Sequence, residues 1–280
     1  MREDCDHSRL TIQITIIRIE DYGPWTLTLG SDREARLQML QSRLYYDVQR
    51  LFSEKECLAY SNRFDEYFTI SNGLSVSDHV AIYKQLASLY TNLNLSMTIG
   101  KGNTPFEANV YAHKSRQAGE SLATDANIFG QAMLHFSSDF AFSKPSQTAS
   151  NLASLNGDFV QIMHVDVNNS KKISLDLSPY EITCLMVKIY SLLSDEFLKK
   201  GCLTFFIGGD NFMVISNDTT KEEAETVIDK VGMTVGIKLN CGIGIGKTGR
   251  NAASNATKAL DTIRDLREKG KIHTVLKFNE

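Results

Sequence analysis

The sequence contains few cysteines and few prolines, and both shortages exclude classes of protein. Only five of its 280 residues are cysteine and four are proline. The cysteines are Cys5, Cys57, Cys184, Cys202 and Cys241. They are odd in number and far apart, so neither a disulfide framework nor a zinc ribbon is expected. We therefore expect a cytoplasmic protein, and the low proline content argues against a long disordered tail.

Long apolar runs and an excess of one charge are also missing. No stretch reaches the ~18 apolar residues that a membrane-spanning helix needs, and the polar start MREDCDHSR lacks the basic tip and apolar run of a signal peptide. Lysine and arginine number 30 against 33 aspartates and glutamates, a net charge of −3. With no excess positive charge, neither nucleic acid nor a membrane is expected as a partner.

The chain does contain an internal repeat. Each half begins with an apolar strand that ends in acid, IQITIIRIED with Glu20 and FVQIMHVDVN with Asp166. A Ser-x-x-Glu capping box and an amphipathic helix follow in each half, starting at Ser31 and at Ser178. Next come two short strands around an acidic turn, NRFD with Asp65 and GGDN with Asp210. The order of signals is the same in both halves, which indicates a tandem duplication.

The repeat predicts an α+β fold of two βαββαβ units, each with the ferredoxin-like order of elements. We expect antiparallel sheets with helices on one face. The predicted domains are residues 10–140 and 158–280, joined by a connector at 141–157. The final strand of the first unit is expected near Ala132 to Phe136.

The position of the carboxylates in this unit suggests a metal site. A right-handed crossover makes the first two strands parallel with the third between them, so Asp166 and Asp210 should converge at one end of the sheet. Gly208 and Gly209 would let a ligand approach the backbone closely. Two carboxylates with a backbone carbonyl suit Mg²⁺, which commonly carries nucleotide phosphates. The alternative is that GGDN is only a hairpin turn and Asp166 a solvated strand end.

Five segments together carry a resemblance to a known family: IEDYGPWT, NRFDEYFTISNG, HVDVNN, FFIGGDNFM and GIGIGKT. They resemble archaeal GTP cyclohydrolase III, a relative of the GGDEF and class III cyclase palm domains. The resemblance implies two palm-like domains in a homo-oligomer, either a dimer or a tetramer. It also implies Mg²⁺-dependent opening of the imidazole ring of GTP, giving 2-amino-5-formylamino-6-ribosylamino-4(3H)-pyrimidinone 5′-monophosphate and inorganic phosphate.

The resemblance also assigns site residues. Asp166 and Asp210 match the metal carboxylates of palm domains, and Asn211 stands where related cyclases have a further acid, so these three are the catalytic candidates. Glu20 and Asp65 are their expected counterparts in the first unit and candidate metal ligands. The family tends to have Asp then Asn where this chain has Glu20 and Asp21, which weakens a metal site there.

Nucleotide binding is expected from Gly208, Gly209 and Asn168 in the second unit and from Tyr22 and Trp25 in the first. The two aromatic rings could stack on guanine, since base stacking contributes ~1 to 3 kcal/mol per base. The alternative is that Trp25 fills a domain interface. Two other functions stay open, a nucleotidyl or diguanylate cyclase-like enzyme and a non-catalytic GTP-binding sensor.

Overall fold

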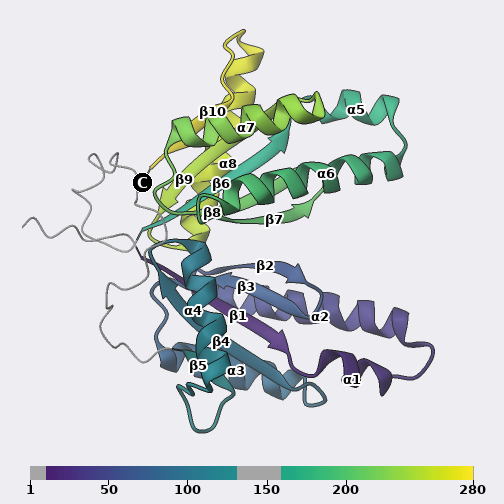
Figure 1. The fold of residues 1–280 in the computed structure, drawn as a ribbon, viewed down its shortest axis with the longest axis vertical. Helices are drawn as coiled ribbons and strands as arrows, with labels where there is room; N and C mark the ends of the chain where they lie inside the picture. The colour runs from purple at the N-terminus through teal and green to yellow at the C-terminus, as the bar shows by residue number, and fades with distance from the viewer. Residues whose placement is uncertain (1–10, 131–158, 280) are drawn as a thin grey trace, which may run out of the picture.

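The computed structural model describes residues 11–130 and 159–279, here called the first half and the second half. The first half contains β1 (Ile12–Ile19), α1 (Tyr22–Leu27), α2 (Arg33–Ser53), β2 (Leu58–Arg63), β3 (Glu66–Ile70), α3 (Val76–Leu89), β4 (Leu95–Gly102), α4 (Pro105–Ala118) and β5 (Ile128–Gly130). The second half contains β6 (Val160–Val167), α5 (Ser170–Asp176), α6 (Pro179–Leu198), β7 (Leu203–Gly208), β8 (Asn211–Ser216), α7 (Lys221–Val235), β9 (Leu239–Gly246), α8 (Gly249–Glu268) and β10 (Val275–Phe278). The same order of elements in both halves confirms the duplication (Figure 1).

Two sequence-based expectations lie outside the described residues, namely the connector at 141–157 and the strand near 132–136. The last described strand of the first half is β5. The exact domain limits of 10–140 and 158–280 therefore remain predictions.

Each half forms one five-stranded sheet, in the order β2-β3-β1-β4-β5 and β10-β9-β6-β8-β7. Strand β3 lies between β1 and β2 and is antiparallel to both, so β1 and β2 run parallel as predicted. The edge strands β5 and β10 are the exception to the antiparallel pattern, because each runs parallel to its neighbour. Both follow a third long helix, which carries the chain back across the sheet.

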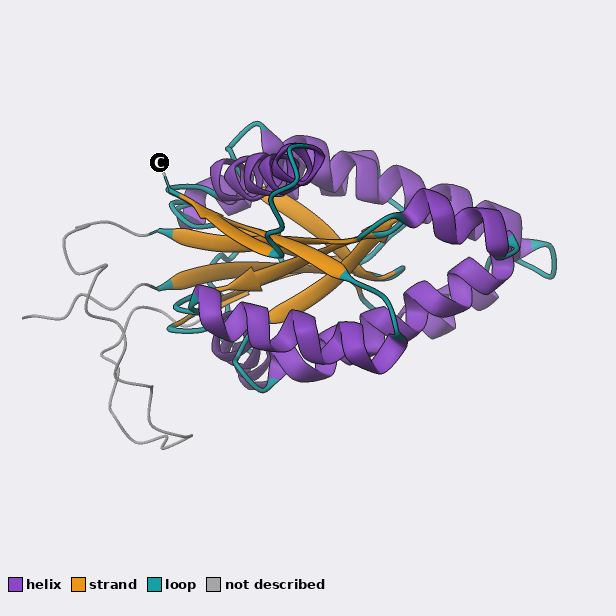
Figure 2. Ribbon diagram, turned by 90° about the horizontal axis from the view of Figure 1, so that it is seen from above, coloured by secondary structure: helices purple, strands orange, loops and turns teal. Residues whose placement is uncertain are grey.

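Helices cover both faces of each sheet. In the first half α2 and α3 cover one face, and in the second half α6 and α7 do the same. The prediction of helices on one face holds for these four. Helices α4 and α8 lie on the opposite face, so that helices flank the strands on two sides (Figure 2). They pack closely there because glycines of β4 and β9, such as Gly100 and Gly244, face alanines of the helices.

Of the two capping boxes predicted from the sequence, one is present. Ser178 and Glu181 form the predicted capping box at the start of α6. The box predicted at Ser31 is wrong, because α2 begins one residue later, after Asp32, which makes no side-chain cap. Among the described residues, none of the helices combines the length and apolarity that crossing a membrane would require.

A shared core joins the two halves, and it contains residues of both sheets together with α4 and α8. The rings of Tyr60 on β2 and Phe205 on β7 stack at its centre, with 4.9 Å between centroids. The backbone N–H of Phe106 donates to Gly201 O at 2.9 Å. The matching contact in the other direction runs from Arg250 N–H to Glu56 O at 3.3 Å. These reciprocal contacts give the molecule an approximate two-fold symmetry.

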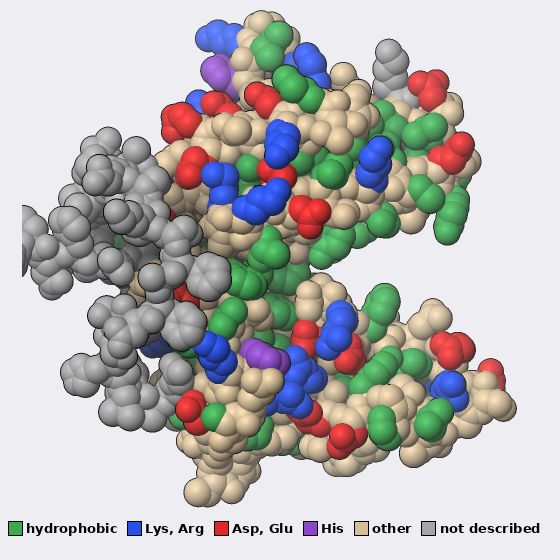
Figure 3. All heavy atoms as spheres, viewed as in Figure 1, with side chains coloured by type: hydrophobic (Ala, Val, Ile, Leu, Met, Phe, Trp, Pro, Cys, Tyr) green, Lys and Arg blue, Asp and Glu red, His purple; other side chains and the backbone are tan. Residues whose placement is uncertain are grey.

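Beyond the shared core the two halves diverge. In Figure 1, β1 and β6 point toward the same side of the molecule and away from each other, and Figure 3 shows a hollow between the halves on that side. Val160 and Ile162 of β6 belong to the shared core. Because side chains alternate along a strand, His164 and Asp166 continue the same face of the sheet beyond that core.

Candidate functional site

The structure places Asp166 and Asp210 at the same end of the second sheet. Asp166 is the penultimate residue of β6 and lies opposite Asn211, the first residue of β8. Asp210 immediately precedes Asn211 in the tight turn between β7 and β8. The convergence predicted from the crossover rule is therefore present, since the end of the first strand and the turn between the next two meet at one sheet end.

The turn before Asp210 depends on its glycines. Gly208 has a φ of 111° and Gly209 a φ of 62°. Both backbone angles lie in a region that residues other than glycine rarely adopt. Apart from its own chain neighbours, none of the described residues has an atom within 4 Å of the position that a Cβ of Gly208 would take. The turn therefore leaves space beside Gly208, and the approach of a ligand to Gly208 and Gly209 stays a prediction.

Asp166 is almost completely buried, with 3% of its surface exposed, and both carboxylate oxygens have donors. The amide of Asn240 donates to Oδ1 at 2.7 Å. The guanidinium of Arg264, on α8, donates to Oδ2 at 2.6 Å. Asp166 is therefore not a solvated strand end, the alternative that the sequence had left open.

Asp210 and Asn211 belong to a chain of hydrogen bonds that reaches α8. The amide nitrogen of Asn211 donates to Asp210 Oδ1 at 2.8 Å, and its oxygen accepts from His164 Nε2 at 3.0 Å. His164 Nδ1 lies 3.1 Å from the hydroxyl of Thr257. Burial lowers the pKa of His164, because desolvation disfavours the imidazolium. Both polar atoms of the Asn211 amide are thus engaged, so this residue orients Asp210.

Asn168 lies beside a cationic side chain and a shallow pocket. Its oxygen accepts from Arg267 Nη1 at 2.7 Å, and Arg267 also donates to Asn240. A shallow pocket at this point is lined by Asn168, Asn169, Ile173, Gly236, Ile237 and Lys238. Arg267 and the backbone carbonyl of Lys238, which accepts from the Asn168 N–H at 2.9 Å, thus fix Asn168 at this surface, and its nucleotide-binding role stays a prediction.

The register of the sheets corrects the counterpart assigned to Asp166 in the first half. Asp166 pairs with Asn211 on one side and Asn240 on the other. The residue in the matching position is Arg18, which pairs with Glu66 and Ser96. The assignment of Glu20 as the counterpart is therefore wrong by two residues. A shift of two keeps every side chain on its face, so hydrophobic alternation alone could not reveal it.

Glu20 instead occupies the position of Asn168. The backbone N–H of Glu20 donates to Asn94 O at 2.7 Å, as that of Asn168 does to Lys238 O at 2.9 Å. Burial acts to raise the pKa of the Glu20 carboxyl, but hydrogen bonds from Arg116 and Ser96 outweigh it and lower the pKa. Glu20 is thus held as a carboxylate paired with Arg116.

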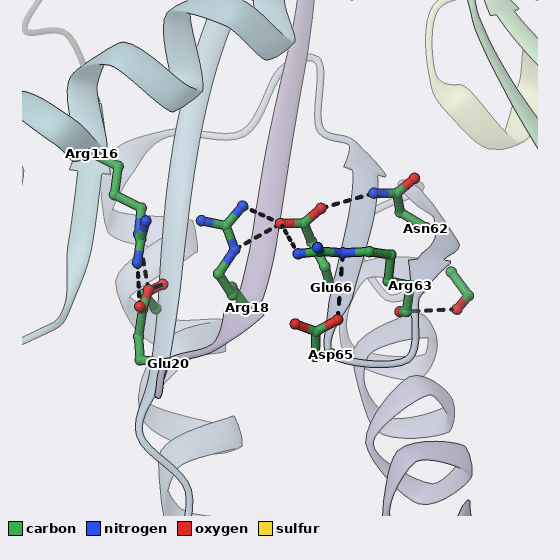
Figure 4. Close-up of polar contacts among 9 residues, drawn as sticks. Arg18, Glu20, Asn62, Arg63, Asp65, Glu66 and Arg116 are labelled. Carbon is green, nitrogen blue, oxygen red and sulfur yellow. Dashed lines mark hydrogen bonds and ion pairs between the residues drawn. The ribbon is translucent and has the colours of Figure 1, made fainter. Parts of the chain in front are cut away.

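At the corresponding end of the first sheet, the carboxylates are paired with arginines (Figure 4). Arg18 pairs with Glu66. Arg63 lies 3.5 Å from Asp65 and 3.4 Å from Glu66. Arg63 and Phe64 also replace the two glycines of the second-half turn. A guanidinium therefore accompanies each of these carboxylates, including Asp65 in the turn, whereas Asp210 in the equivalent turn of the second half accepts from the neutral amide of Asn211.

Tyr22 and Trp25 lie on the short helix α1, with 6.1 Å between ring centroids. Both are partly buried against the core of the first half alone. Trp25 therefore does not fill the interface between the halves, which was the alternative to a binding role. The Tyr22 hydroxyl accepts from Gln41 at 2.6 Å. Burial and the nearby charges of Asp65 and Glu34 raise the pKa of Tyr22.

The geometry defines what this end of the second half can do. Within the ranges 11–130 and 159–279, no three His, Cys, Asp or Glu side chains cluster as a metal site. Two carboxylates with backbone oxygens and water are nevertheless a set that Mg²⁺ accepts, because that ion retains several waters. Sequence reasoning missed Asn240, Thr257, Arg264 and Arg267. The only local signal was the spacing of the two arginines, i and i+3, on one side of a helix.

Comparisons with known proteins agree on one family. A family model described as GTP cyclohydrolase III matches residues 14–277. The chain is 36% identical over 254 residues to GTP cyclohydrolase III of Methanocaldococcus jannaschii, covering 90% of this chain and 88% of that protein. The corresponding protein of Methanosphaera stadtmanae is 35% identical over 254 residues, covering 90% of this chain and 93% of the relative.

Solved structures are more distant. The GGEEF domain of a diguanylate cyclase from Vibrio cholerae superposes with a TM-score of 0.35 and 12% identity, over 44% of this chain and 84% of that one. A bacterial light-regulated adenylyl cyclase gives a TM-score of 0.37 and 10% identity, over 95% of this chain and 85% of that one.

Proposed function

Because this chain belongs to the GTP cyclohydrolase III family, we propose that it hydrolyses GTP and opens the imidazole ring of the guanine. The proposed products are 2-amino-5-formylamino-6-ribosylamino-4(3H)-pyrimidinone 5′-monophosphate and inorganic phosphate. One water adds to C8, and the C8–N9 bond breaks with its electron pair and a proton going to N9, so C8 stays on N7 as a formyl group. Hydrolysis of the two phosphoanhydride bonds gives the monophosphate and two phosphate ions.

The observation that supports this proposal is the pair of carboxylates, Asp166 and Asp210, at one end of the second sheet. Asp166 is fixed at this end of the sheet by hydrogen bonds from Asn240 and Arg264. Asp210 has Asn211 as its hydrogen-bond partner on one oxygen, so its carboxylate retains capacity for ligands. We propose that these two residues hold Mg²⁺.

Bound Mg²⁺ would neutralise phosphate oxygens and favour attack of water on phosphorus. The residues of the chain then have separate tasks. Asp166 and Asp210 fix the cation, and Asn211 orients Asp210 through the hydrogen-bond chain to His164. The open turn at Gly208 and Gly209 gives the phosphates access to backbone N–H groups. Asn168, with Arg267 beside it, supplies further donors for the nucleotide.

One incubation distinguishes this function from its alternatives. The protein would be mixed with GTP and Mg²⁺, with an EDTA sample as the control, and followed by purine absorbance, phosphate release and mass spectrometry. Loss of purine absorbance with free phosphate and a product one water heavier than GMP is expected. A cyclase would release pyrophosphate and keep the purine absorbance. Unchanged GTP would favour a sensor.

The assembly and location also belong to the proposal. We propose a cytoplasmic homo-oligomer, either a dimer or a tetramer, whose substrate is GTP. The exposed side chains of Met39 and Tyr46 on α2, and of Tyr180 and Val187 on α6, give both halves apolar surface outside the shared core. Exposed apolar patches of this kind commonly mark protein contacts.

Trp25 is proposed to form part of the guanine pocket together with Tyr22. By the register described above, Tyr22 at the start of α1 matches Ser170 at the start of α5, so the two halves differ in sequence at this point. Trp25→Ala is expected to weaken GTP binding by about tenfold, because one base stack contributes ~1 to 3 kcal/mol. Discrimination between GTP and ATP should fall as well.

Calorimetric titration with GTP and ATP would check this, with Trp25→Phe as the matched variant that keeps an aromatic ring. Thermal unfolding would show that both variants fold, since Trp25 also contacts the first-half core. If Trp25→Ala folds and leaves both GTP affinity and base discrimination unchanged, the pocket lies elsewhere.

A further inference from the structure

Arg264 on α8 makes a contact with Asp166 that combines a buried acid with an exposed base. The side chain of Asp166 is 5% exposed and that of Arg264 is 47% exposed. A carboxylate with so little access to water needs a cationic partner, since an unpaired buried charge is strongly destabilising. Asn240 donates to the other oxygen but carries no charge. Within the described structure, Arg264 therefore provides the positive charge that allows Asp166 to stay ionised.

Arg264 and a divalent cation cannot both bind the same carboxylate oxygen of Asp166. The guanidinium donates to Oδ2 at 2.6 Å, and a metal ion on that oxygen would be a like charge within a few ångströms. Repulsion between like charges at that distance is large in a poorly solvated site. Binding of Mg²⁺ at Asp166 thus requires Arg264 to move away.

The structure permits that movement without displacing the helix. Leu260 and Ile263 are fully buried and fix this part of α8. The Arg264 side chain is half in solvent and already contacts Asp261 at 2.9 Å, so a second anion is within reach. Asn240 would stay on Asp166, because Arg267 binds its amide oxygen. Only one long side chain has to change its rotamer.

We propose that Arg264 is an exchangeable counter-ion: it neutralises Asp166 in the metal-free enzyme and transfers to the polyphosphate of the nucleotide when Mg²⁺ binds. This inference rests on the proposed function, since it assumes that Asp166 is a metal ligand. It assigns to Arg264 a place in the substrate site. It also favours joint binding of metal and nucleotide. Mg²⁺ on Asp166 leaves the Arg264 guanidinium without a partner, which the polyphosphate supplies, and the polyphosphate on Arg264 leaves the Asp166 carboxylate without a partner, which Mg²⁺ supplies.

The first test measures metal alone. Arg264→Met removes the charge, and Arg264→Lys keeps the charge without the planar fork. In EDTA, Arg264→Met should unfold at a lower temperature than the wild type. Titration with Mn²⁺ in the absence of nucleotide, followed by electron paramagnetic resonance, should give about tenfold tighter binding, equivalent to ~1.4 kcal/mol, because the metal no longer displaces a guanidinium.

The second test measures a non-hydrolysable GTP analogue in the presence of Mg²⁺. Arg264→Met should bind it about tenfold more weakly, and Arg264→Lys should lie between Met and the wild type for both ligands. The matched control is Arg116→Met, which removes the Arg116–Glu20 ion pair of the first half. This control should lower the unfolding temperature without changing Mn²⁺ affinity.

Opposite changes in the two affinities are the signature of exchange. A purely structural role for Arg264 would weaken both ligands or neither, and either outcome would overturn the proposal. Tighter metal binding with unchanged nucleotide affinity would also overturn it, because the guanidinium would then transfer to nothing. Asp166→Asn separates this result from failure of the proposed function. If it leaves Mn²⁺ affinity unchanged while the wild type converts GTP, the metal assignment is at fault and the reaction stands.

Discussion

Replacing Asp210 by asparagine is expected to reduce GTP turnover by about a thousandfold, the scale seen when one group that stabilises transition-state charge is removed. Asp210 is one of the two carboxylates proposed to hold Mg²⁺ against the triphosphate. An amide supplies an oxygen but no negative charge, so the cation would be held by Asp166 alone. The loss should appear in kcat, because charge on the phosphate develops during the reaction.

The fold of Asp210→Asn should remain intact. The carboxylate lies in a partly exposed turn and accepts a hydrogen bond from Asn211 at 2.8 Å, which an asparagine oxygen can also accept. The expected change in the free energy of unfolding is below ~1 kcal/mol. Phosphate release and thermal unfolding would be measured on the same samples. A wild-type kcat in this variant would show that Asp210 has no part in the reaction.

Two further aspartates make the comparison specific. Asp229→Asn changes the same charge on the exposed side of α7 and should keep wild-type kinetics. Asp65→Asn changes the equivalent turn in the first half, where Arg63 lies 3.5 Å from the carboxylate. Its effect on kcat should be much smaller than that of Asp210→Asn, because Asp65 is already paired with a guanidinium.

The fold was largely predictable because its signals are local and repeated. Capping at Ser178, the acidic turn at Asp210 and the apolar alternation of β6 each depend on a few adjacent residues. The meeting of Asp166 with the turn at Asp210 then followed from the handedness of the crossover. The parallel edge strands and the helices on the second face were not foreseen, because they depend on how α4 and α8 return the chain across each sheet.

The surroundings of the carboxylates could not be read in the same way. Arg264 and Asn240 are 98 and 74 residues from Asp166 in the chain, and their contacts exist only once α8 and β9 pack on β6. The first-half counterpart was misplaced for a related reason. Alignment on the acid at the end of each strand selects Glu20, whereas hydrogen-bond register selects Arg18. Sequence patterns identify the face of a strand well and the position along it poorly.

Gly244→Ala is expected to destabilise the protein by about 3 kcal/mol or more, the upper range for overpacking in a close-packed interior. Gly244 lies in β9 directly beneath α8. A methyl group there would approach both Ala252 O and Ala256 N to 2.1 Å. These are backbone atoms of a helix that cannot rotate away as a side chain would, so α8 as a whole has to shift.

The same shift should reach the functional site, because α8 also carries Thr257, which contacts His164, and Arg264, which contacts Asp166. Folded Gly244→Ala is therefore expected to lose GTP turnover as well as stability. The matched variant is Gly100→Ala in the first half, where a methyl would lie 2.0 Å from Ala108 O of α4. It should cost similar stability with a smaller effect on kcat. Gly23→Ala, where none of the described residues outside the glycine's own helix has an atom within 4 Å of the added carbon, is the control for the change in stability only.

Denaturant unfolding would give the free-energy differences, and initial rates at a temperature where all variants are folded would give kcat. If Gly244→Ala unfolds at the wild-type denaturant concentration, then α8 does not rest on β9 as described. If it is destabilised but turns GTP over at the wild-type rate, the contacts that α8 makes with Asp166 and His164 are not needed for catalysis. That second result would leave the carboxylates and the Gly208–Gly209 turn as the part of the second half on which the reaction depends.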